Sequence, residues 1–458
     1  MKKREFDVIV IGAGSGLIIS SYAANKGLKV AIVEEGPFGG TCLNRGCIPS
    51  KMLIHVADVI EIIKKANLFG VEVNVNKIDW KKIQKWVWNT VDPSAKDIEE
   101  ANKSAKNITV YKTRGEFVDK KVLKVKDELI TAEKIFICAG TRPNIPEIEG
   151  LNDINYITSN EALRLEKQPK KMAIIGGGYI SAELGHFFSS LGTDVKIVYR
   201  GERLLKNEDG EIAEAFTKIV SKKYNVMLNT DILKVSKKGN NIAVKLKQNK
   251  KEKEIIVDTL LLTTGRVSNT DILKVEKTNV KTKNGFIEVN KYMETNVPGI
   301  FAIGDVVGRY QFKHSANLEA NYCVYNAFNP TKKIEVDYSA MPHAIFTSPQ
   351  IAGVGFTEQE LKEKNIKYLT GKYNYYKTGM GKAIEDKDGF VKVLVDLKTK
   401  EILGCHILGY DAATLIQEVI VAMKNKLGVK GITDAVHIHP ALPEVVLKAF
   451  NSIKGINK

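Results

Sequence analysis

Apolar residues along the chain group into short uninterrupted runs, and two of these runs lead directly into a cluster of glycines. The first run, Val8 to Ile11, is followed by Gly12, Gly14 and Gly16, then by a helix-like stretch and a second apolar run, "KVAIVE". Continuous apolar runs of this length, bounded by glycine, are typical of buried strands. The order strand, glycine turn, helix, strand predicts an α/β unit with a parallel sheet.

The residues at the turn of this unit are those of a dinucleotide-binding site. Gly12 suits a tight turn, Gly14 lets the backbone approach a pyrophosphate, and Glu34, about 20 residues farther on, can bind ribose hydroxyls. The usual third glycine, which allows close packing of helix and strand, is replaced by Leu17. We expect the neighbouring Gly16 to relieve that contact.

The same arrangement occurs a second time, in "MAIIGGGYISAELGHFFSSLGTDVKIVYR". Gly176, Gly177 and Gly178 follow a strand, and a further strand runs from Val195 to Tyr199; Ser181 takes the place of the third glycine. Each copy also closes with a similar strand end, "FICAGTRPN" and "LLTTGRVSN". The repeat predicts two dinucleotide-binding domains in one chain.

The two copies differ where the ribose would bind, which indicates two different ligands. Glu34 of the first copy corresponds to Tyr199 in the second, followed by Arg200, Arg203 and Lys206. A carboxylate would repel a 2′-phosphate, whereas arginine can bind one through charge-assisted hydrogen bonds. The alternative is an ordinary basic surface loop. The pattern favours NADPH at the second site, with NADH possible.

Composition narrows the class of protein. The 458 residues are 44% hydrophobic and carry a net charge of +16, but the lysines are spread along the whole chain, which indicates a solvated surface and no nucleic-acid partner. No apolar run is long enough for a membrane span. The start, "MKKREFDVIVIGAGSGLIIS", mimics a signal peptide, but Asp7 and the glycines argue against one. Five mostly scattered cysteines favour a reducing compartment, so we expect a cytoplasmic protein that contacts no membrane.

Two of the five cysteines, Cys42 and Cys47, lie close together in "GGTCLNRGCIPSKM". Such a pair could be a structural disulfide, half of a metal site or a redox couple. The local sequence does not decide between these.

Three segments carry a resemblance to a known family. They are "GGTCLNRGC", "TNVPGIFAIGDV" with Gly304 and Asp305 after its strand, and the C-terminal "HIHPALPE". With them, the chain resembles the class I FAD-dependent pyridine nucleotide-disulfide oxidoreductases from about Phe6 to Phe450. The resemblance implies an α/β fold with two Rossmann-like domains plus a C-terminal α+β dimerisation domain. The expected division is FAD domain 1–150, NAD(P) domain 151–270, central domain 271–334 and dimerisation domain 335–458.

Physical reasoning about the cysteine pair agrees with a redox role. Five residues of regular helix rise about 7.5 Å, so a bond between Cys42 and Cys47 requires a distorted turn, which Gly46 permits. Pro49 suits the first turn of a helix, which would stabilise a thiolate at Cys47 near the positive helix end. A zinc site would need two further ligands nearby, and a structural disulfide does not suit a reducing compartment. We therefore expect a redox couple and no metal.

The resemblance also implies a role for each active-site residue. Cys47 would lie against the flavin as the charge-transfer thiol and Cys42 would exchange with substrate, while Lys51 would face the flavin and pair with Glu183. His439 would be the acid-base group, oriented by Glu444 and supplied by the other subunit of a homodimer with shared sites; His437 and His314 match the family less closely. The expected cofactor contacts are Gly12, Gly14, Gly16, Glu34, Thr41, Lys51, Gly115, Gly140, Gly176, Gly178, Tyr199, Arg200, Arg203, Lys206, Gly265, Arg266, Gly304 and Asp305.

Details of the motifs point to different members of the family. "GCIPSK" resembles dihydrolipoamide dehydrogenase, whereas "GAGSGL", "MPHAIFTSPQIAGVG" and "HPALPEVV" are closer to mycothione reductase. Mercuric reductase is disfavoured, because that group ends in a cysteine pair and no cysteine follows Cys405.

The sequence thus predicts an FAD-dependent NAD(P)H:disulfide oxidoreductase that passes electrons through Cys42 and Cys47 to or from a small dithiol or disulfide, as dihydrolipoamide dehydrogenase does. One alternative is an NADPH-dependent reductase of a low-molecular-weight disulfide, of the mycothione or glutathione reductase type. Another is a non-catalytic FAD-binding protein, against which the intact Cys42, Cys47, His439 and Glu444 argue. The disulfide itself is left open.

Overall fold

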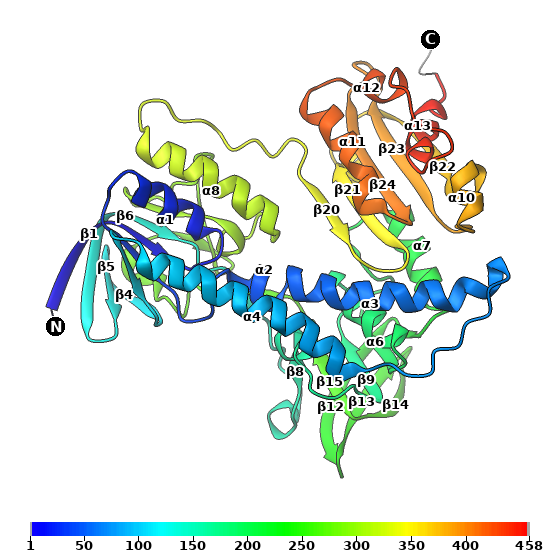
Figure 1. The fold of residues 1–458 in the computed structure, drawn as a ribbon, viewed down its shortest axis with the longest axis horizontal. Helices are drawn as coiled ribbons and strands as arrows, with labels where there is room; N and C mark the ends of the chain where they lie inside the picture. The colour runs from blue at the N-terminus through cyan, green and yellow to red at the C-terminus, as the bar shows by residue number, and fades with distance from the viewer. Residues whose placement is uncertain (1, 456–458) are drawn as a thin grey trace.

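Seven strands form the sheet of the N-terminal lobe, at the left of Figure 1, in a computed structural model that describes residues 2–455. Their order is β3-β2-β1-β6-β5-β4, and β19 pairs with the second half of β6. Strands β1, β2, β3, β6 and β19 are parallel, whereas β4 and β5 form an antiparallel extension. The strands are β1 (Lys2–Ile11), β2 (Val30–Val33), β3 (Ile108–Tyr111), β4 (Gly115–Asp119), β5 (Val122–Val125), β6 (Glu128–Ile137) and β19 (Ile300–Ala302).

Helices α1 (Gly16–Asn25) and α8 (Lys313–Phe328) cover one face of this sheet. Ile19 and Ala23 of α1 and Val324 of α8 are buried against Val8 and Val10 of β1, because apolar residues point to both faces of a central parallel strand. A segment some 300 residues from the N-terminus therefore completes the first lobe.

The second lobe repeats this design. Its sheet, ordered β11-β10-β9-β15-β8, is parallel throughout, and an antiparallel meander, β12-β13-β14, is appended to it. Its elements are β8 (Ile157–Thr158), α5 (Ser159–Ala162), β9 (Lys171–Ile175), α6 (Tyr179–Ser190), β10 (Asp194–Val198), α7 (Gly210–Val220), β11 (Asn225–Met227), β12 (Thr230–Lys238), β13 (Asn241–Gln248), β14 (Lys251–Val257) and β15 (Thr259–Leu262).

The C-terminal lobe, at the upper right of Figure 1, is built on an antiparallel sheet of order β20-β21-β24-β23-β22. Helices α11 and α13 pack on it through a separate apolar core. Its elements are β20 (Pro342–Ile345), β21 (Gln350–Gly355), α9 (Glu358–Glu363), β22 (Tyr368–Asn374), α10 (Gly379–Ala383), β23 (Phe390–Asp396), β24 (Ile402–Gly409), α11 (Ala412–Lys424), α12 (Lys430–Thr433) and α13 (Glu444–Asn451).

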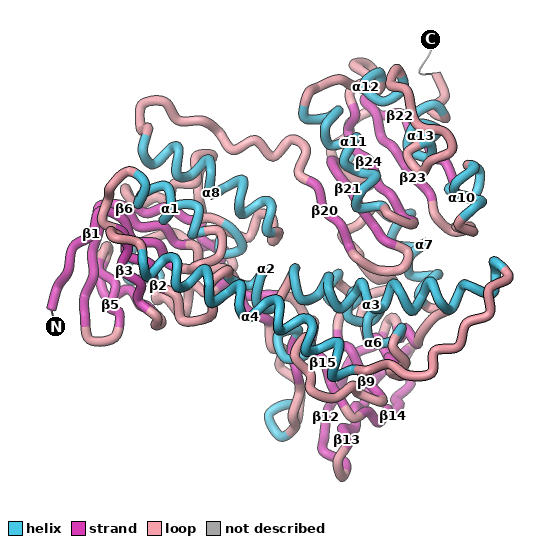
Figure 2. Tube along the Cα trace, in the orientation of Figure 1, coloured by secondary structure: helices cyan, strands magenta, loops and turns pink. Residues whose placement is uncertain are grey.

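Three helices and a two-stranded link run between the lobes. The helices are α2 (Gly40–Arg45), α3 (Cys47–Lys65) and α4 (Trp80–Ser104); α3 leaves the first lobe and crosses between the second and the third (Figure 2). The link is an antiparallel pair of β7 (Thr141–Pro143) with β16 (Arg266–Ser268), and a further short pair joins β17 (Thr282–Lys283) to β18 (Phe286–Ile287). Within residues 2–455, no helix combines the length and the apolar character needed to cross a membrane.

The fold class predicted from the sequence is confirmed, with two Rossmann-like units and a C-terminal sheet covered by helices. The division into four domains stays a prediction.

Candidate active site

A cavity of about 1430 Å³ lies where the three lobes meet. Its wall includes Gly14 and Cys42 from the first lobe, Glu183 from the second and His343 from the third. Ligand pockets commonly measure about 300 to 1,000 Å³, so this cavity has room for a large cofactor together with a substrate.

The glycine loop after β1 forms one end of the cavity. Gly12 has a φ of +105°, and a Cβ atom there would lie 2.3 Å from the Cys138 carbonyl oxygen, so only glycine fits. A Cβ atom on Gly16 would lie 2.7 Å from Val10 Cγ1, so Gly16 provides the close helix-strand contact in place of Leu17. Helix α1 begins here with neither a capping side chain nor an acidic residue in its first turn, so no carboxylate opposes a pyrophosphate at its positive end.

Two partly buried carboxyl groups lie along the same cavity. Glu34 Oε2 accepts a hydrogen bond from Ala13 N at 2.8 Å and Oε1 accepts one from Gly36 N at 2.7 Å. Asp305 Oδ2 accepts one from Thr141 Oγ1 at 3.0 Å. Burial raises the pKa of both carboxyl groups above their ordinary values. The glycine loop, the N-terminus of α1 and these two acids together fit FAD.

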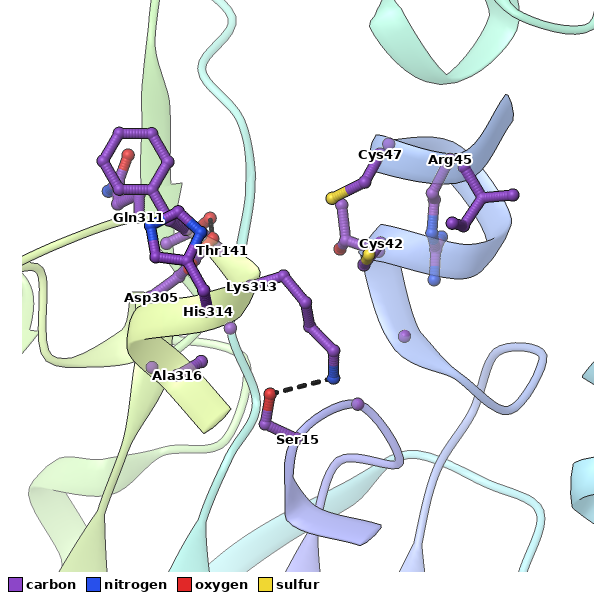
Figure 3. A pocket seen from close by; sticks show the side chains of 18 of the residues that line it. Ser15, Cys42, Arg45, Cys47, Thr141, Asp305, Gln311, Lys313, His314 and Ala316 are labelled. Atoms are coloured by element: carbon purple, nitrogen blue, oxygen red, sulfur yellow. Dashed lines mark hydrogen bonds between the residues drawn. The ribbon is translucent and has the colours of Figure 1, made fainter. Parts of the chain in front are cut away.

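The cysteine pair lies at a break between two helices, as Figure 3 shows. Helix α2 ends at Arg45, Gly46 adopts φ −151° and ψ −115°, and α3 begins at Cys47. A Cβ atom on Gly46 would lie 2.9 Å from the Thr41 carbonyl oxygen, so the break depends on glycine. Both cysteines are half-buried thiols that line the cavity.

The two sulfurs have opposite protonation preferences. A hydrogen bond from the Cys42 thiol is the main reason that the pKa of Cys47 is lowered to about 7, and the charge of Lys51 lowers it further. The same hydrogen bond, together with burial, raises the pKa of Cys42. Because Cys47 also begins α3, the positive helix end favours its thiolate.

Lys51 connects all three lobes. Its Nζ atom donates to both oxygens of Glu183, at 2.9 and 2.8 Å, and lies 4.7 Å from the ring centre of Phe346. Glu183 Oε1 also accepts from Phe346 N at 3.0 Å. Glu183 is only 6% exposed, so the ion pair provides the partner that a buried carboxylate requires.

The second glycine loop is shaped like the first. Gly176 has a φ of +135°, and a Cβ atom there would lie 2.5 Å from the Thr263 carbonyl oxygen. The Tyr199 ring lies against Gly177. Of the basic residues that follow, Arg200 and Lys206 are exposed, whereas Arg203 Nη1 donates to Glu214 at 3.3 Å.

His439 and Glu444 lie in the C-terminal lobe, in contact with each other. His439 Nδ1 is 3.0 Å from Glu444 Oε1, and this contact lowers the pKa of Glu444. The imidazole is 76% exposed on a loop before α13 that also presents Val436 and Ile438 to solvent. His437 is instead buried against Glu418, at 3.1 Å.

The structure brings together some of the residues expected from the sequence. Those on the cavity wall are Gly12, Gly14, Glu34, Thr41, Cys42, Cys47, Lys51, Gly140, Glu183, Arg266, Gly304 and Asp305. The expected residues that lie elsewhere in the described chain are Gly16, Gly115, Gly176, Gly178, Tyr199, Arg200, Arg203, Lys206, Gly265, His439 and Glu444.

Sequence reasoning missed several cavity residues. Among them are Tyr179 at the start of α6, Lys313 at the start of α8, and His343, whose Nε2 is 2.7 Å from Glu208 Oε2. The only local signal was the proximity of Tyr179 to the second glycine cluster. Lys313 belongs to none of the quoted motifs, and His343 lies in "MPHAIFTSPQIAGVG", which indicated a resemblance but no role for this residue.

Comparisons with known proteins agree with this geometry. The family profile described as "Pyridine nucleotide-disulphide oxidoreductase" matches residues 6–320, and the profile of that family's dimerisation domain matches residues 341–450. The chain is similar to a mycothione reductase of Mycobacterium tuberculosis, with 37% identity over 98% of this chain and 99% of the relative. A dihydrolipoyl dehydrogenase of Geobacillus stearothermophilus is 34% identical over 98% of this chain and 97% of the relative.

A solved structure shares the whole arrangement. It is the HOCl-induced flavoprotein disulfide reductase RclA from Escherichia coli, with a TM-score of 0.86, 26% identity, and coverage of 97% of this chain and 99% of that chain. Since the family profiles and the full-length relatives together account for nearly the entire sequence, this chain belongs to the pyridine nucleotide-disulphide oxidoreductase family and is an FAD-dependent oxidoreductase that works with NAD(P)H.

Proposed function

We propose that this enzyme reduces a small disulfide in the cytoplasm with electrons from NADPH, using Cys42 as the exchange thiol and Cys47 as the thiol on the FAD side. The observation that carries the proposal is the difference in protonation preference between the two cysteines at the break between α2 and α3. Cys47 is held toward thiolate and Cys42 toward thiol within one cavity. A dithiol with one ionised member at neutral pH is suited to thiol-disulfide exchange.

The proposed exchange has two steps. Cys42 gives its proton to a base, and its thiolate attacks one sulfur of the substrate RSSR; the substrate S–S bond breaks, and RS⁻ leaves and is protonated. The Cys47 thiolate then attacks the Cys42 sulfur, which forms the Cys42–Cys47 disulfide and releases the second RS⁻. Bound FAD supplies the two-electron path from NADPH that returns the pair to the dithiol.

The base in this proposal is His439 of the partner subunit. Because the pKa of Cys42 is raised, its thiol needs a base within hydrogen-bond reach before it can attack. Glu444 occupies Nδ1 of its own chain's His439 and leaves Nε2 free for proton transfer. The exposure of this imidazole on the dimerisation domain supports a role in a neighbouring subunit's site.

Two observations support a low-molecular-weight disulfide as the substrate and NADPH as the donor. The relative at 37% identity is named for mycothione, and no carboxylate stands at Tyr199, where one would repel a 2′-phosphate. The second candidate is oxidation of a dihydrolipoyl group with NAD⁺, which the relative at 34% identity favours. Steady-state rates with dihydrolipoamide and NAD⁺, set against NADPH with a panel of disulfides, discriminate between the two.

A complementation experiment tests the shared site. Differently tagged Cys42→Ser and His439→Gln chains are co-expressed, and the mixed dimer is isolated by both tags. One of its two sites has both Cys42 and His439 intact, so we expect disulfide reduction well above that of either parent homodimer. The control is the mixed dimer of two differently tagged Cys42→Ser chains. A mixed dimer as inactive as its parents, with FAD bound to both chains, would contradict the proposal.

A further inference from the structure

A second lysine, Lys313, projects into the cavity from the first residue of α8. Figure 3 shows its side chain extending from α8 toward the side of the cavity that carries Cys42 and Cys47. Its Nζ atom donates to Ser15 Oγ at 3.0 Å, and Ser15 Oγ in turn donates to Asn317 Oδ1 at 2.9 Å. Because Asn317 lies one turn farther along α8, this chain of hydrogen bonds begins and ends on the same helix and fixes the position of the ammonium group.

The charge of Lys313 is not compensated in the way that the charge of Lys51 is. Lys51 forms an ion pair with Glu183, and the negative charge of Glu183 opposes a thiolate at Cys47. Lys313 forms no ion pair with a carboxylate within residues 2–455; its partner is the neutral hydroxyl of Ser15. An uncompensated ammonium group acts more strongly on a nearby sulfur than one that is already paired with a carboxylate.

The two lysines differ in the sulfur that each influences most. Lys51 lies one helical turn after Cys47 and lowers the pKa of that thiol. For Cys42, whose pKa is raised by the hydrogen bond to Cys47 and by burial, the leading opposing influence is the charge of Lys313, ahead of Lys51. Of the two lysines, Lys313 of α8 thus acts more strongly on Cys42, whereas Lys51 of α3 acts on both thiols.

We propose that Lys313 is a positioning residue for Cys42, whose ammonium group stabilises negative charge on the Cys42 sulfur whenever that sulfur is a thiolate. The inference rests on the proposed function, in which Cys42 gives its proton to a base and then attacks the substrate disulfide. It also applies in the return direction, when two-electron reduction breaks the Cys42–Cys47 bond and leaves negative charge on the Cys42 sulfur. Lys313 transfers no proton and forms no covalent bond in either step.

The test is the pH dependence of Cys42 alkylation by the neutral reagent iodoacetamide in the NADPH-reduced holoenzyme, with the modified cysteine identified by peptide mass spectrometry. In Lys313→Met we expect the midpoint for Cys42 to rise by about one pH unit, a roughly tenfold smaller thiolate fraction below the midpoint. Lys313→Arg should restore most of the wild-type midpoint. Ser15→Ala, which frees the lysine, should produce a smaller rise.

The matched control is Lys424→Met. Lys424 lines the same cavity, but its ammonium group is paired with Asp337, so this variant should leave the Cys42 midpoint unchanged. An unchanged midpoint in FAD-saturated Lys313→Met overturns the inference, including the case in which that variant binds FAD more weakly and Lys313 is therefore a cofactor contact. Alkylation is scored at Cys42 alone, and disulfide turnover that survives Cys42→Ser would instead contradict the assignment of Cys42 as the exchange thiol.

Discussion

Cys42 and Cys47 are the same residue type a few positions apart, yet a single hydrogen bond between them has opposite effects on their pKa values. The Cys42 thiol donates, so the hydrogen bond stabilises the Cys47 thiolate and opposes ionisation of the donor. A Cys42→Ala substitution removes the donor, and we expect the pKa of Cys47 to rise above its value of about 7. Cys42→Ser keeps a hydroxyl donor, so the pKa of Cys47 in this variant should lie between its values in the wild type and in Cys42→Ala.

The measurement is ultraviolet thiolate absorbance against pH, with the Cys42→Ala/Cys47→Ala double variant subtracted as the matched control. A Cys47 midpoint that stays near pH 7 in Cys42→Ala would assign its acidity to the helix end and Lys51 instead.

At the scale of elements, the second and third lobes are joined by a buried charge cluster. Lys392 of β23 is 2% exposed, and its Nζ atom lies 2.9 Å from Asp209 Oδ1, where α7 begins, and 2.7 Å from Glu358 Oε2, where α9 begins. Asp209 is fully buried. Lys392→Met would leave that buried carboxylate without its ammonium partner. We therefore expect the free energy of unfolding to fall by about 3 to 5 kcal/mol in urea titrations.

The control for this prediction is Lys245→Met. Lys245, on β13 of the second lobe, pairs with Glu252 at the surface at 2.7 Å and has no contact with the Lys392 cluster, and exposed pairs contribute at most about 1 kcal/mol. Equal losses of unfolding free energy in the two variants would show that burial of the Lys392 cluster adds nothing to stability.

Acid should weaken the same junction. Burial raises the pKa of Glu358, but hydrogen bonds, first among them the one from Lys392, outweigh this effect. The pKa is therefore lowered from its ordinary value of 4.5 to about 2. A carboxyl group with a lower pKa in the folded than in the unfolded state contributes stability that is fully present above the unfolded pKa and is lost progressively as the pH falls to the folded pKa. We therefore expect the urea midpoint to decline between about pH 4.5 and pH 2, and to decline less over this range in Glu358→Gln.

The loop after β10 bears on cofactor choice. Arg200 is exposed at the end of this strand and is free to bind a 2′-phosphate, whereas Arg203 already donates to Glu214. We expect Arg200→Ala to lower kcat/KM for NADPH about tenfold or more and to leave that for NADH nearly unchanged, since a charge-assisted hydrogen bond contributes about 1.5 to 3 kcal/mol. Arg200→Lys should lower kcat/KM for NADPH by a smaller factor. A wild type that strongly prefers NADH would contradict this prediction.

At the scale of the whole molecule, the dimerisation domain leaves apolar side chains uncovered in a single chain. Val436 is 100% exposed and Ile438 is 78% exposed, on the loop that carries His439. An Ile438→Asp substitution should weaken the dimer in sedimentation experiments and reduce disulfide turnover while FAD stays bound. Val118→Asp, at an exposed apolar position on β4 in the first lobe, is the matched control.

The sequence could predict contacts between residues that are close along the chain, but not contacts between residues that are far apart in it. The glycine loops and the cysteine pair are local patterns, so the turn at Gly12 and the helix break at Gly46 could be predicted from neighbouring residues. Lys313 and Ser15 are separated by 298 positions, and Lys392 and Asp209 by 183. Nothing near any of these four residues indicates its partner, because Lys313 and Ser15 meet only when α8 packs on the first lobe, and Lys392 and Asp209 meet only when the second and third lobes pack together.

The position of His439 on an exposed loop has a consequence for genetics. Under the proposed sharing, an allele that encodes only Cys42→Ser, expressed equally with the wild type, leaves about half of all sites working, because each mixed dimer keeps one complete site. An allele that encodes Cys42→Ser and His439→Gln together disables both sites of every mixed dimer and leaves about a quarter. The double allele would therefore be dominant-negative in a cell, whereas either single allele would only reduce the number of working sites in proportion to its expression.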